Sequence, residues 1–136
     1  DAASGRGRAS YGALVLVVDD DALVREAMQS LLAQWGCTVV AAATGEEAVA
    51  LLEGGDRLPD ALLCDYRLPG GETGIEVIRR LQAVAGRAIP AALVSADTAP
   101  ESLLAARASG YPLLSKPLAP AKLRALLEHL VATTHP

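Results

Sequence analysis

The stretch LVLVVDDDAL, residues 14–23, joins an apolar segment directly to a cluster of charge. Leu14–Val18 is an unbroken aliphatic run, and the three adjacent carboxylates Asp19–Asp21 follow it. A continuous apolar run of this length is typical of a strand in a parallel sheet that is covered on both faces. Because three like charges at the end of a buried strand repel one another, we expect either a proton or a cation among them.

Four further short apolar runs alternate with helical patterns along the chain. They predict strands at Thr38–Ala42, Ala61–Cys64, Ala91–Ser95 and Leu113–Ser115. Apolar residues recur at helical spacing between the runs, so helices are expected over residues 22–35, from 44 to 54, near 74–85, from 98 to 109 and from 120 to 131. Five strand–helix units in sequence predict a doubly wound α/β domain.

Capping patterns indicate where three of the helices start. Thr44 with Glu47, and Thr98 with Glu101, have the spacing of a capping box. In that motif each side chain accepts a hydrogen bond from the backbone N–H of the other residue. Asp21 is expected to be the N-cap of the first helix, where the helix dipole favours a carboxylate.

The composition excludes several classes of function. Hydrophobic residues make up 51% of the chain but aromatic residues only 3%, so the core must be aliphatic. The net charge of −4 and the lack of a Lys/Arg stripe argue against nucleic acid as a partner. No apolar run approaches the roughly 20 residues that cross a bilayer, so we expect no membrane contact by this domain. Cys37 and Cys64 lack metal-ligand or redox spacing, which favours core thiols in a reducing, cytoplasmic compartment.

The start of the chain differs in composition from the rest. Residues 1–11 are rich in Gly, Ser, Ala and Arg, which is typical of a flexible linker, and they contain no apolar signal-peptide core. The chain begins with Asp, so we expect it to be a piece of a longer polypeptide. The folded domain is expected over residues 12–133.

Polar residues follow three other predicted strands. Asp65 comes after the third strand, Ser95 ends the fourth and Lys116 follows the fifth. In doubly wound sheets ligands bind outside the carboxyl ends of the strands, so these residues should join the aspartates after the first strand. Carboxylates without His or Cys suit a hard cation, and Mg²⁺ fits best, with Mn²⁺ or Ca²⁺ as alternatives.

A divalent ion among carboxylates, beside a lysine and a serine, indicates phosphoryl chemistry. Lys116 would neutralise one phosphoryl oxygen and the Ser95 hydroxyl would donate to another. With a carboxylate as the nucleophile, the product is an acyl phosphate.

Four segments together resemble the receiver domain of two-component signalling, the phosphoacceptor family of response regulators and hybrid histidine kinases. They are LVVDDD, CDYRLPGGETGIEVI, VSAD and LLSKP, and the resemblance covers nearly all of the chain beyond the linker. The resemblance implies a flavodoxin-like (βα)5 fold with the parallel strand order 2-1-3-4-5.

The resemblance also implies a role for each residue of a metal site. Asp65 would be the phosphoacceptor and a ligand of Mg²⁺. Asp20 would bind the ion directly, and Asp19 would bind it through water. The backbone carbonyl of Arg67, two residues past the acceptor, would complete the site.

The phosphoryl group would be contacted by residues from the last two strands. The resemblance assigns this role to the Ser95 hydroxyl, the Ala96 backbone and the Lys116 ammonium. The peptide bond before Pro117 is expected to be cis, as is usual in the family and as the tertiary amide permits at low cost.

The resemblance implies a histidine kinase phosphohistidine domain or a histidine phosphotransfer protein as the partner. Ala22, Arg25 and Gln29, on the outer face of the first helix, would meet it, although they could equally form a solvated face. Many receivers that drive transcription carry Tyr or Phe at the position of Leu113, and here Tyr111 stands two residues earlier. That difference favours the C-terminal receiver of a hybrid sensor histidine kinase.

One further pair of charges flanks the predicted acceptor. Arg67 lies two positions after Asp65, and Asp97 lies two positions after Ser95. We hypothesise that Arg67 and Asp97 pair across the mouth of the site, restrict water and slow hydrolysis of the acyl phosphate. Two solvated loop charges are the simpler alternative.

Two other functions fit parts of the sequence. VVDDDA also resembles the first motif of haloacid-dehalogenase-type phosphatases, in which Asp19 would be the nucleophile and Asp21 the acid/base. Turnover of a generic phosphate ester would distinguish that enzyme from a receiver. A degenerate receiver that acts as a phosphorylation-independent interaction module is the other alternative, although every residue of the expected site is present.

Overall fold

A computed structural model describes residues 12–134, so the predicted linker at residues 1–11 lies outside the described residues. The strands are β1 (Leu14–Val18), β2 (Thr38–Ala42), β3 (Ala61–Asp65), β4 (Ala91–Ser95) and β5 (Leu113–Ser115). The helices are α2 (Ala22–Gln34), α3 (Gly45–Gly54), α4 (Gly74–Ala85), α5 (Pro100–Ser109) and α6 (Pro120–Thr134), with the short 3-10 helix η1 (Pro69–Gly71) before α4.

The strands form one parallel sheet in the order β2-β1-β3-β4-β5. The predicted flavodoxin-like fold is therefore confirmed. All of the predicted strands are present, and only β3 is longer than expected, because Asp65 still pairs with Val94 of β4. The acceptor candidate is thus the last residue of a fully buried central strand.

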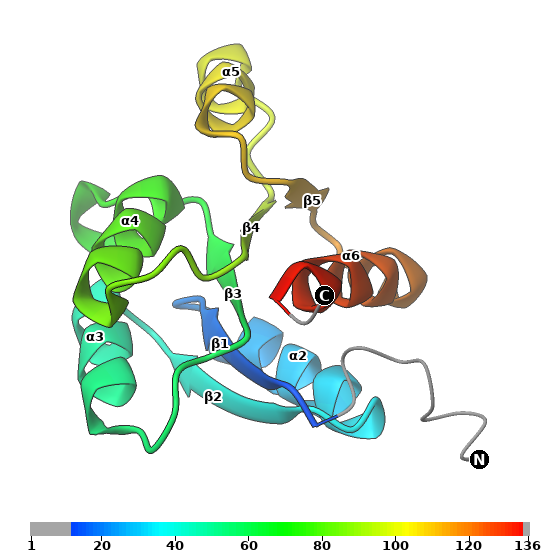
Figure 1. Cartoon of the computed structure of the whole chain (residues 1–136). Helices are drawn as coiled ribbons and strands as arrows, with labels where there is room; N and C mark the ends of the chain where they lie inside the picture. The colour runs from blue at the N-terminus through cyan, green and yellow to red at the C-terminus, as the bar shows by residue number, and fades with distance from the viewer. Residues whose placement is uncertain (1–11, 135–136) are drawn as a thin grey trace.

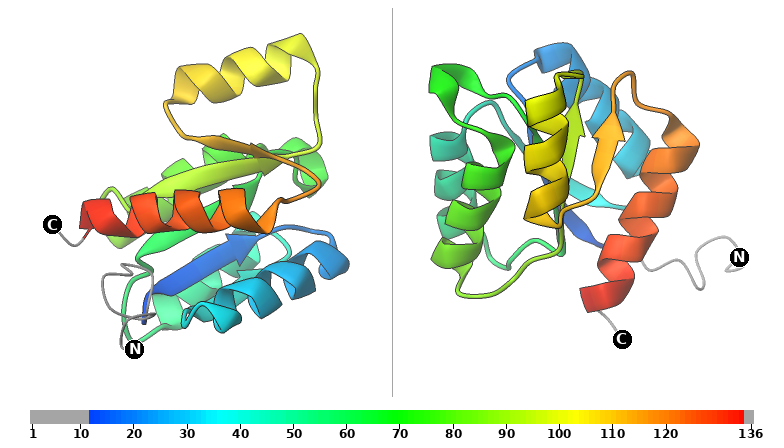
Figure 2. Two further views of the ribbon diagram at one scale, coloured as in Figure 1. Left: turned by 90° about the vertical axis from the view of Figure 1, so that its right-hand side faces the viewer. Right: turned by 90° about the horizontal axis from the view of Figure 1, so that it is seen from above.

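Helices cover both faces of the sheet, as Figures 1 and 2 show. On one face α3 and α4 pack side by side and α5 lies beyond them, over the β4 side. On the other face α2 and α6 enclose a second apolar cluster that includes Met28, Leu32, Leu123 and Leu127. Both clusters are almost entirely aliphatic, as the composition predicts.

The helix starts confirm one predicted cap and correct two others. Asp21 is the N-cap of α2, and its carboxylate accepts from the Leu23 N–H. At α3, Thr44 accepts from the Glu47 N–H, but the Glu47 carboxylate accepts from the Ala43 N–H and not from that of Thr44. The predicted capping box at Thr44 is therefore only half formed.

The capping box predicted at Thr98 is wrong. α5 begins at Pro100, and its N-cap Ala99 has an extended backbone and no side-chain cap. The residue before a proline is driven out of the helical region, which places Glu101 one position too early for a box. A complete capping box that we did not predict joins Thr73 and Glu76 at the start of α4.

Two predictions from composition can be compared with the structure. Cys37 and Cys64 are both free and buried, as expected for core thiols. Among the described residues, no helix combines the length and apolar character that crossing a membrane requires.

Candidate functional site

Three carboxylates meet where β1 and β3 end. Asp19 follows β1 and is 1% exposed, Asp65 ends β3 and is also buried, and Asp20 is exposed. One oxygen from each carboxylate can be chosen so that all three lie within 4.8 Å of one another. This is the gathering that the parallel strands predict for the carboxyl edge of the sheet.

Asp19 is held through its side chain and its backbone by residues at the start of α2. The Asp21 N–H donates to Asp19 Oδ1 over 2.9 Å. The Arg25 guanidinium, one turn into α2, donates to the Asp19 carbonyl over 2.7 Å. Asp21 caps the helix and does not belong to the cluster of three acids. The acid/base role that the phosphatase alternative requires of Asp21 therefore has no support in this geometry.

Lys116 contacts two of the three carboxylates in the acidic cluster. Its Nζ is 3.0 Å from Asp19 Oδ2 and 3.5 Å from Asp65 Oδ2. The next peptide bond, Lys116–Pro117, is cis. The contact with Asp19 has ion-pair distance but not hydrogen-bond geometry, so Asp19 Oδ2 is buried without a hydrogen bond in the described part of the chain.

The electrostatics of the cluster follow from this crowding. Burial, and next the charge of Asp19, raise the pKa of Asp65 to about 6, although Lys116 opposes the shift. Burial lowers the pKa of Lys116, but Asp19 and Asp65 outweigh it, so the pKa is raised overall. Asp65 is therefore still an anion at pH 7, and one ammonium serves two carboxylates.

The residues fit a hard divalent cation. Asp19 Oδ2 is a buried carboxylate oxygen without a hydrogen bond, and Asp20 and Asp65 offer further oxygens at ligand spacing. Oxygen donors of this kind, partly open to water, match the preference of Mg²⁺. The balance of charge also favours a bound cation, because among the described residues Lys116 is the ion-pair partner of both Asp19 and Asp65.

Ser95 is the last residue of β4, and Ala96 follows it. Ser95 is buried, and its Oγ accepts from the Asp97 N–H over 2.9 Å. Its carbonyl accepts from the Lys116 N–H, which ties the serine strand to the lysine strand. Ala96 lies in the exposed loop that follows.

Arg67 and Asp97 meet as an ion pair. Arg67 Nε donates to Asp97 Oδ2 over 2.7 Å, and Arg67 Nη2 donates to Ser102 Oγ over 2.8 Å. Ser102 Oγ in turn donates to Asp97 Oδ2 over 2.7 Å. The Ala99 N–H, and then Ser102 and Arg67, lower the pKa of Asp97 to about 2. Ser102 is buried in α5 and was missed, because a serine inside a helix carries no signal of its own in the sequence.

Leu113, which stands where many receivers carry Tyr or Phe, and Tyr111, two residues earlier, lie on the same face of the sheet. Tyr111 and Leu113 both pack against the apolar cluster of the α3–α4 face, as their spacing of two predicts. The Tyr111 hydroxyl donates to Gln82 Oε1 of α4 over 3.1 Å. Tyr111 is thus held by α4 and not by the acidic cluster.

The predicted docking residues lie on α2 beside the cluster. Ala22 and Gln29 are exposed, whereas Arg25 is half-buried and engaged with the Asp19 carbonyl. Leu23, which we did not single out, is 76% exposed on the same turn. A large apolar side chain next to the charged edge could have been noticed as a contact residue from the sequence.

Comparison with known proteins connects this geometry to a family. The chain matches the model of the response regulator receiver domain over residues 15–128. It is 34% identical over 122 residues to the transcriptional regulatory protein ZraR of Escherichia coli O157:H7, covering 89% of this chain and 27% of that protein. It is 36% identical over 123 residues to the response regulator MprA of Mycobacterium avium, covering 90% and 52% respectively. The chain therefore spans only about a quarter to a half of these relatives.

Solved structures show the same fold. The chemotaxis protein CheY4 of Vibrio cholerae superposes with a TM-score of 0.76 at 28% identity, covering 88% of this chain and 98% of that one. A response regulator receiver protein of Pseudomonas putida gives 0.74 at 32% identity, covering 87% and 97%.

Proposed function

This chain belongs to the response regulator receiver family, and we propose that Asp65 takes a phosphoryl group from the phosphohistidine of a kinase or a histidine phosphotransfer protein. The observation that carries the proposal is the contact of a buried, strand-terminal carboxylate with Lys116 beside two further aspartates.

We propose Mg²⁺ as the cofactor, with Mn²⁺ as a substitute. Asp20 and Asp65 would bind it directly, Asp19 through water, and the Arg67 carbonyl would complete the set. The ion would neutralise both the carboxylates and the phosphoryl oxygens.

The residues of the chain account for the transfer itself. An Asp65 oxygen attacks phosphorus, the new O–P bond forms, and the N–P bond of the phosphohistidine breaks with its electrons leaving on the imidazole. Lys116, already 3.5 Å from Asp65 Oδ2, is placed to contact one phosphoryl oxygen. The Ser95 hydroxyl and the Ala96 N–H are proposed to donate to the others.

Phosphorylation can be tested with a small phosphodonor. The protein is incubated with Mg²⁺ and acetyl phosphate and weighed intact by mass spectrometry. We expect one phosphoryl group on the native chain and none on Asp65→Asn. Asp21→Asn is the matched control, because Asn caps a helix as well as Asp does and this residue lies outside the cluster. If neither the native chain nor the control gains mass, the chain is an interaction module that works without phosphorylation.

The partner is proposed to dock on α2. Leu23 gives that helix an exposed apolar contact, with Ala22 and Gln29 beside it, while Arg25 serves the site by holding the Asp19 carbonyl. Leu23→Ser should slow transfer from a histidine phosphotransfer protein and leave labelling by acetyl phosphate unchanged. Equal slowing of both reactions would contradict a docking role.

The wider context is also a proposal. Leu113, in place of the aromatic residue, favours the C-terminal receiver of a hybrid sensor histidine kinase. We propose that this domain lies in the cytoplasm and that it makes no contact of its own with nucleic acid or membrane. ZraR and MprA are regulators that are longer than this chain, so a stand-alone regulator is the competing context. Phosphoryl transfer from Asp65 onward to a histidine, measured with labelled protein, would support the hybrid kinase.

We also propose that the Arg67–Asp97 ion pair slows loss of the phosphoryl group by restricting water at the mouth of the site. Arg67→Ala should then shorten the lifetime of the phosphorylated form. Arg107→Ala, which removes the same charge at the far end of α5, is the control. An unchanged lifetime in Arg67→Ala would contradict the proposal.

A further inference from the structure

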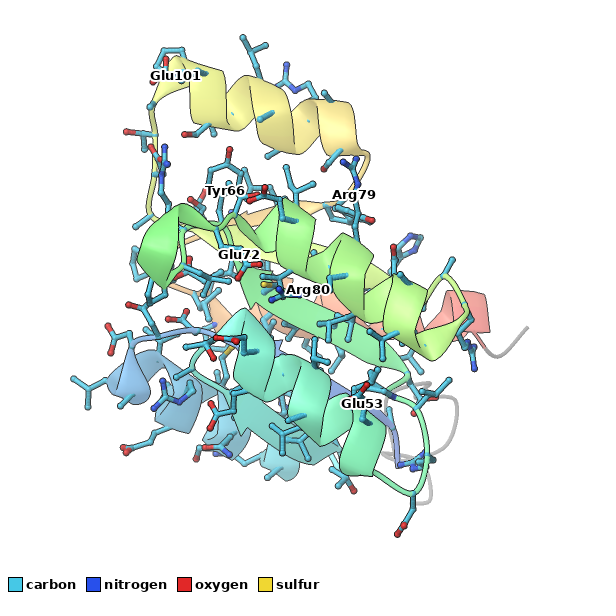
Figure 3. All side chains as sticks on the ribbon, turned by 90° about the vertical axis from the view of Figure 1, so that its left-hand side faces the viewer. Glu53, Tyr66, Glu72, Arg79, Arg80 and Glu101 are labelled. Carbon is cyan, nitrogen blue, oxygen red and sulfur yellow. The ribbon has the colours of Figure 1, made fainter. Side chains whose placement is uncertain are left out.

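Arg80 on α4 forms an ion pair with a loop residue eight positions earlier. Its Nη2 lies 3.0 Å from Glu72 Oε2. Figure 3 shows Arg80 and Glu72 side by side, whereas Arg79 leaves the helix in another direction. Glu72 lies in the loop between η1 and α4, the segment that follows Asp65. The pair therefore ties that loop to the helix.

The guanidinium of Arg80 is only partly satisfied by other groups. Its Nε and Nη2 are buried and make no hydrogen bond in the described part of the chain, because the contact with Glu72 has ion-pair distance without hydrogen-bond geometry. Glu72 is the ion-pair partner of Arg80, and Glu46 and Glu53 of α3 line a shallow pocket together with Arg80. The Arg80 side chain is 40% exposed and that of Glu72 29%, so the pair is partly open to water, and the loss of one partner would remove the contact between the loop and α4.

The pair occupies space that a glycine leaves open. A Cβ atom at Gly45, the first residue of α3, would collide with Arg80 Nη2 and lie 2.8 Å from Glu72 Oε1. The Glu72 carboxylate therefore rests against the start of α3, where unpaired backbone N–H groups favour a negative charge. Three separate elements, the loop, α3 and α4, meet at this point.

The backbone of Glu72 sets the orientation of one particular peptide group. The Leu68 N–H donates to the Glu72 carbonyl over 3.0 Å, and Arg67 pairs with Thr73 in an antiparallel bridge. A trans peptide is planar, so the Arg67 carbonyl points opposite to the Leu68 N–H. Contacts that position the backbone of Glu72 therefore help to orient the Arg67 carbonyl.

The turn between these residues needs such an anchor. Gly70 and Gly71 both have a positive φ, 80° and 79°, so their backbones have more freedom than other residues. The Glu72–Arg80 ion pair lies directly after them and adds a side-chain contact to the backbone hydrogen bonds that hold the loop.

We propose that Arg80 is a positioning residue for the divalent cation. Through Glu72 it holds the loop in which the Arg67 carbonyl is oriented toward its role as a metal ligand. This inference rests on the proposed function, because the carbonyl matters only if the acidic cluster binds Mg²⁺. Nothing in the spacing of the residues along the chain points to Arg80, since a separation of eight is not a contact distance within one helix.

The test compares Mg²⁺ affinity with loop protection. Arg80→Met keeps the apolar stem, Glu72→Gln keeps the shape, and Gly45→Ala displaces the pair from a different element. Each should weaken Mg²⁺ binding about 10-fold in titration calorimetry, a typical loss for a group that supports a metal ligand. Each should also speed amide exchange at Leu68. The double variant of Arg80 and Glu72 should lose no more than either single one.

The control is Arg79→Met, which removes the same charge from the exposed neighbouring position on α4. It should leave both readouts unchanged. Native affinity and native Leu68 protection in folded Arg80→Met or Glu72→Gln would overturn the inference. If the native protein binds no Mg²⁺, the proposed function fails, and the role of Arg80 as a Mg²⁺-positioning residue fails with it; faster Leu68 exchange would then show only that Arg80 holds the loop.

Discussion

α4 and α5 follow the two neighbouring strands that carry Asp65 and Ser95, yet they are attached to the sheet in different ways. α4 starts with a capping box and buries Gly74, Val77, Ile78 and Leu81. α5 has no side-chain cap and buries only Ser102 and Ala106. Its two leucines, Leu103 and Leu104, are exposed.

What holds α5 is a set of hydrogen bonds that starts at the serine hydroxyl. Ser95 Oγ accepts from the Asp97 N–H, and the Asp97 carboxylate accepts from Ser102 of α5. The helix after the acceptor is thus fixed by apolar packing, whereas the helix after the hydroxyl is fixed by polar contacts at the site. A change at the hydroxyl can therefore reach α5 more easily than α4.

The largest expected effect tests the packing of the two helices. Leu81→Ala, in α4, removes a fully buried side chain and should lower the free energy of unfolding by about 2–5 kcal/mol. Leu104→Ala, in α5, removes a side chain that is 65% exposed and should change it by about 0.5 kcal/mol or less. Urea titrations measure both. Equal losses would show that α5 is packed as firmly as α4.

The second prediction concerns the acceptor on the α4 side. Because the pKa of Asp65 is raised to about 6, the folded state holds a proton that the unfolded state releases near pH 4. The free energy of unfolding in metal-free buffer should therefore fall by about 2–3 kcal/mol as pH rises from about 4 to about 6.

Two comparisons isolate that effect. Asp65→Asn should lose this part of the pH dependence and be more stable than the native chain at pH 7. Saturating Mg²⁺ should also reduce the slope, since a cation among the carboxylates favours their ionised forms. The same slope in Asp65→Asn would assign the titration to another group.

The strands and their arrangement could be predicted from the sequence, because strands that are buried on both faces of a sheet appear as continuous apolar runs. Each predicted strand was a continuous apolar run, and the carboxyl ends of parallel strands lie at one edge wherever the helices fall. That rule alone brought Asp19, Asp65 and Lys116 together. The start of α5 was wrong because Pro100 overrode a correct capping spacing.

The contacts that hold the loops were beyond such reasoning. Ser102 meets Arg67 across 35 positions, and Glu72 meets Arg80 in space that Gly45 leaves open. These contacts depend on how three elements approach one another in space, which no local pattern records. The Arg67–Asp97 contact could be hypothesised because each residue lies two positions after the last residue of its strand, and these two strands are neighbours in the sheet.

The third prediction tests the polar attachment of α5. Ser102→Ala removes the hydroxyl that Arg67 and Asp97 share, which should cost about 1–2 kcal/mol because it is buried. Hydrogen exchange should quicken at the amides of α5 and stay unchanged at those of α4, the internal control. Uniform quickening of both helices would indicate a general loss of stability and would remove the distinction between them.

The smallest expected effect lies at acid pH and has the opposite sign to that of Asp65. Hydrogen bonds from the Ala99 N–H, Ser102 and Arg67 lower the pKa of Asp97 to about 2, so this carboxylate stabilises the fold above its unfolded pKa near 4. That contribution should be lost as pH falls from about 4 to about 2, whereas the titration of Asp65 is complete in the folded state by then. Protection from hydrogen exchange, corrected for the intrinsic rate at each pH, should therefore be lost first at α5 in this window. In Asp97→Asn, α5 should exchange faster at pH 5 and lack the acid step. Loss of α4 protection before that of α5 would show that the Asp97 contacts do not set the stability of this helix.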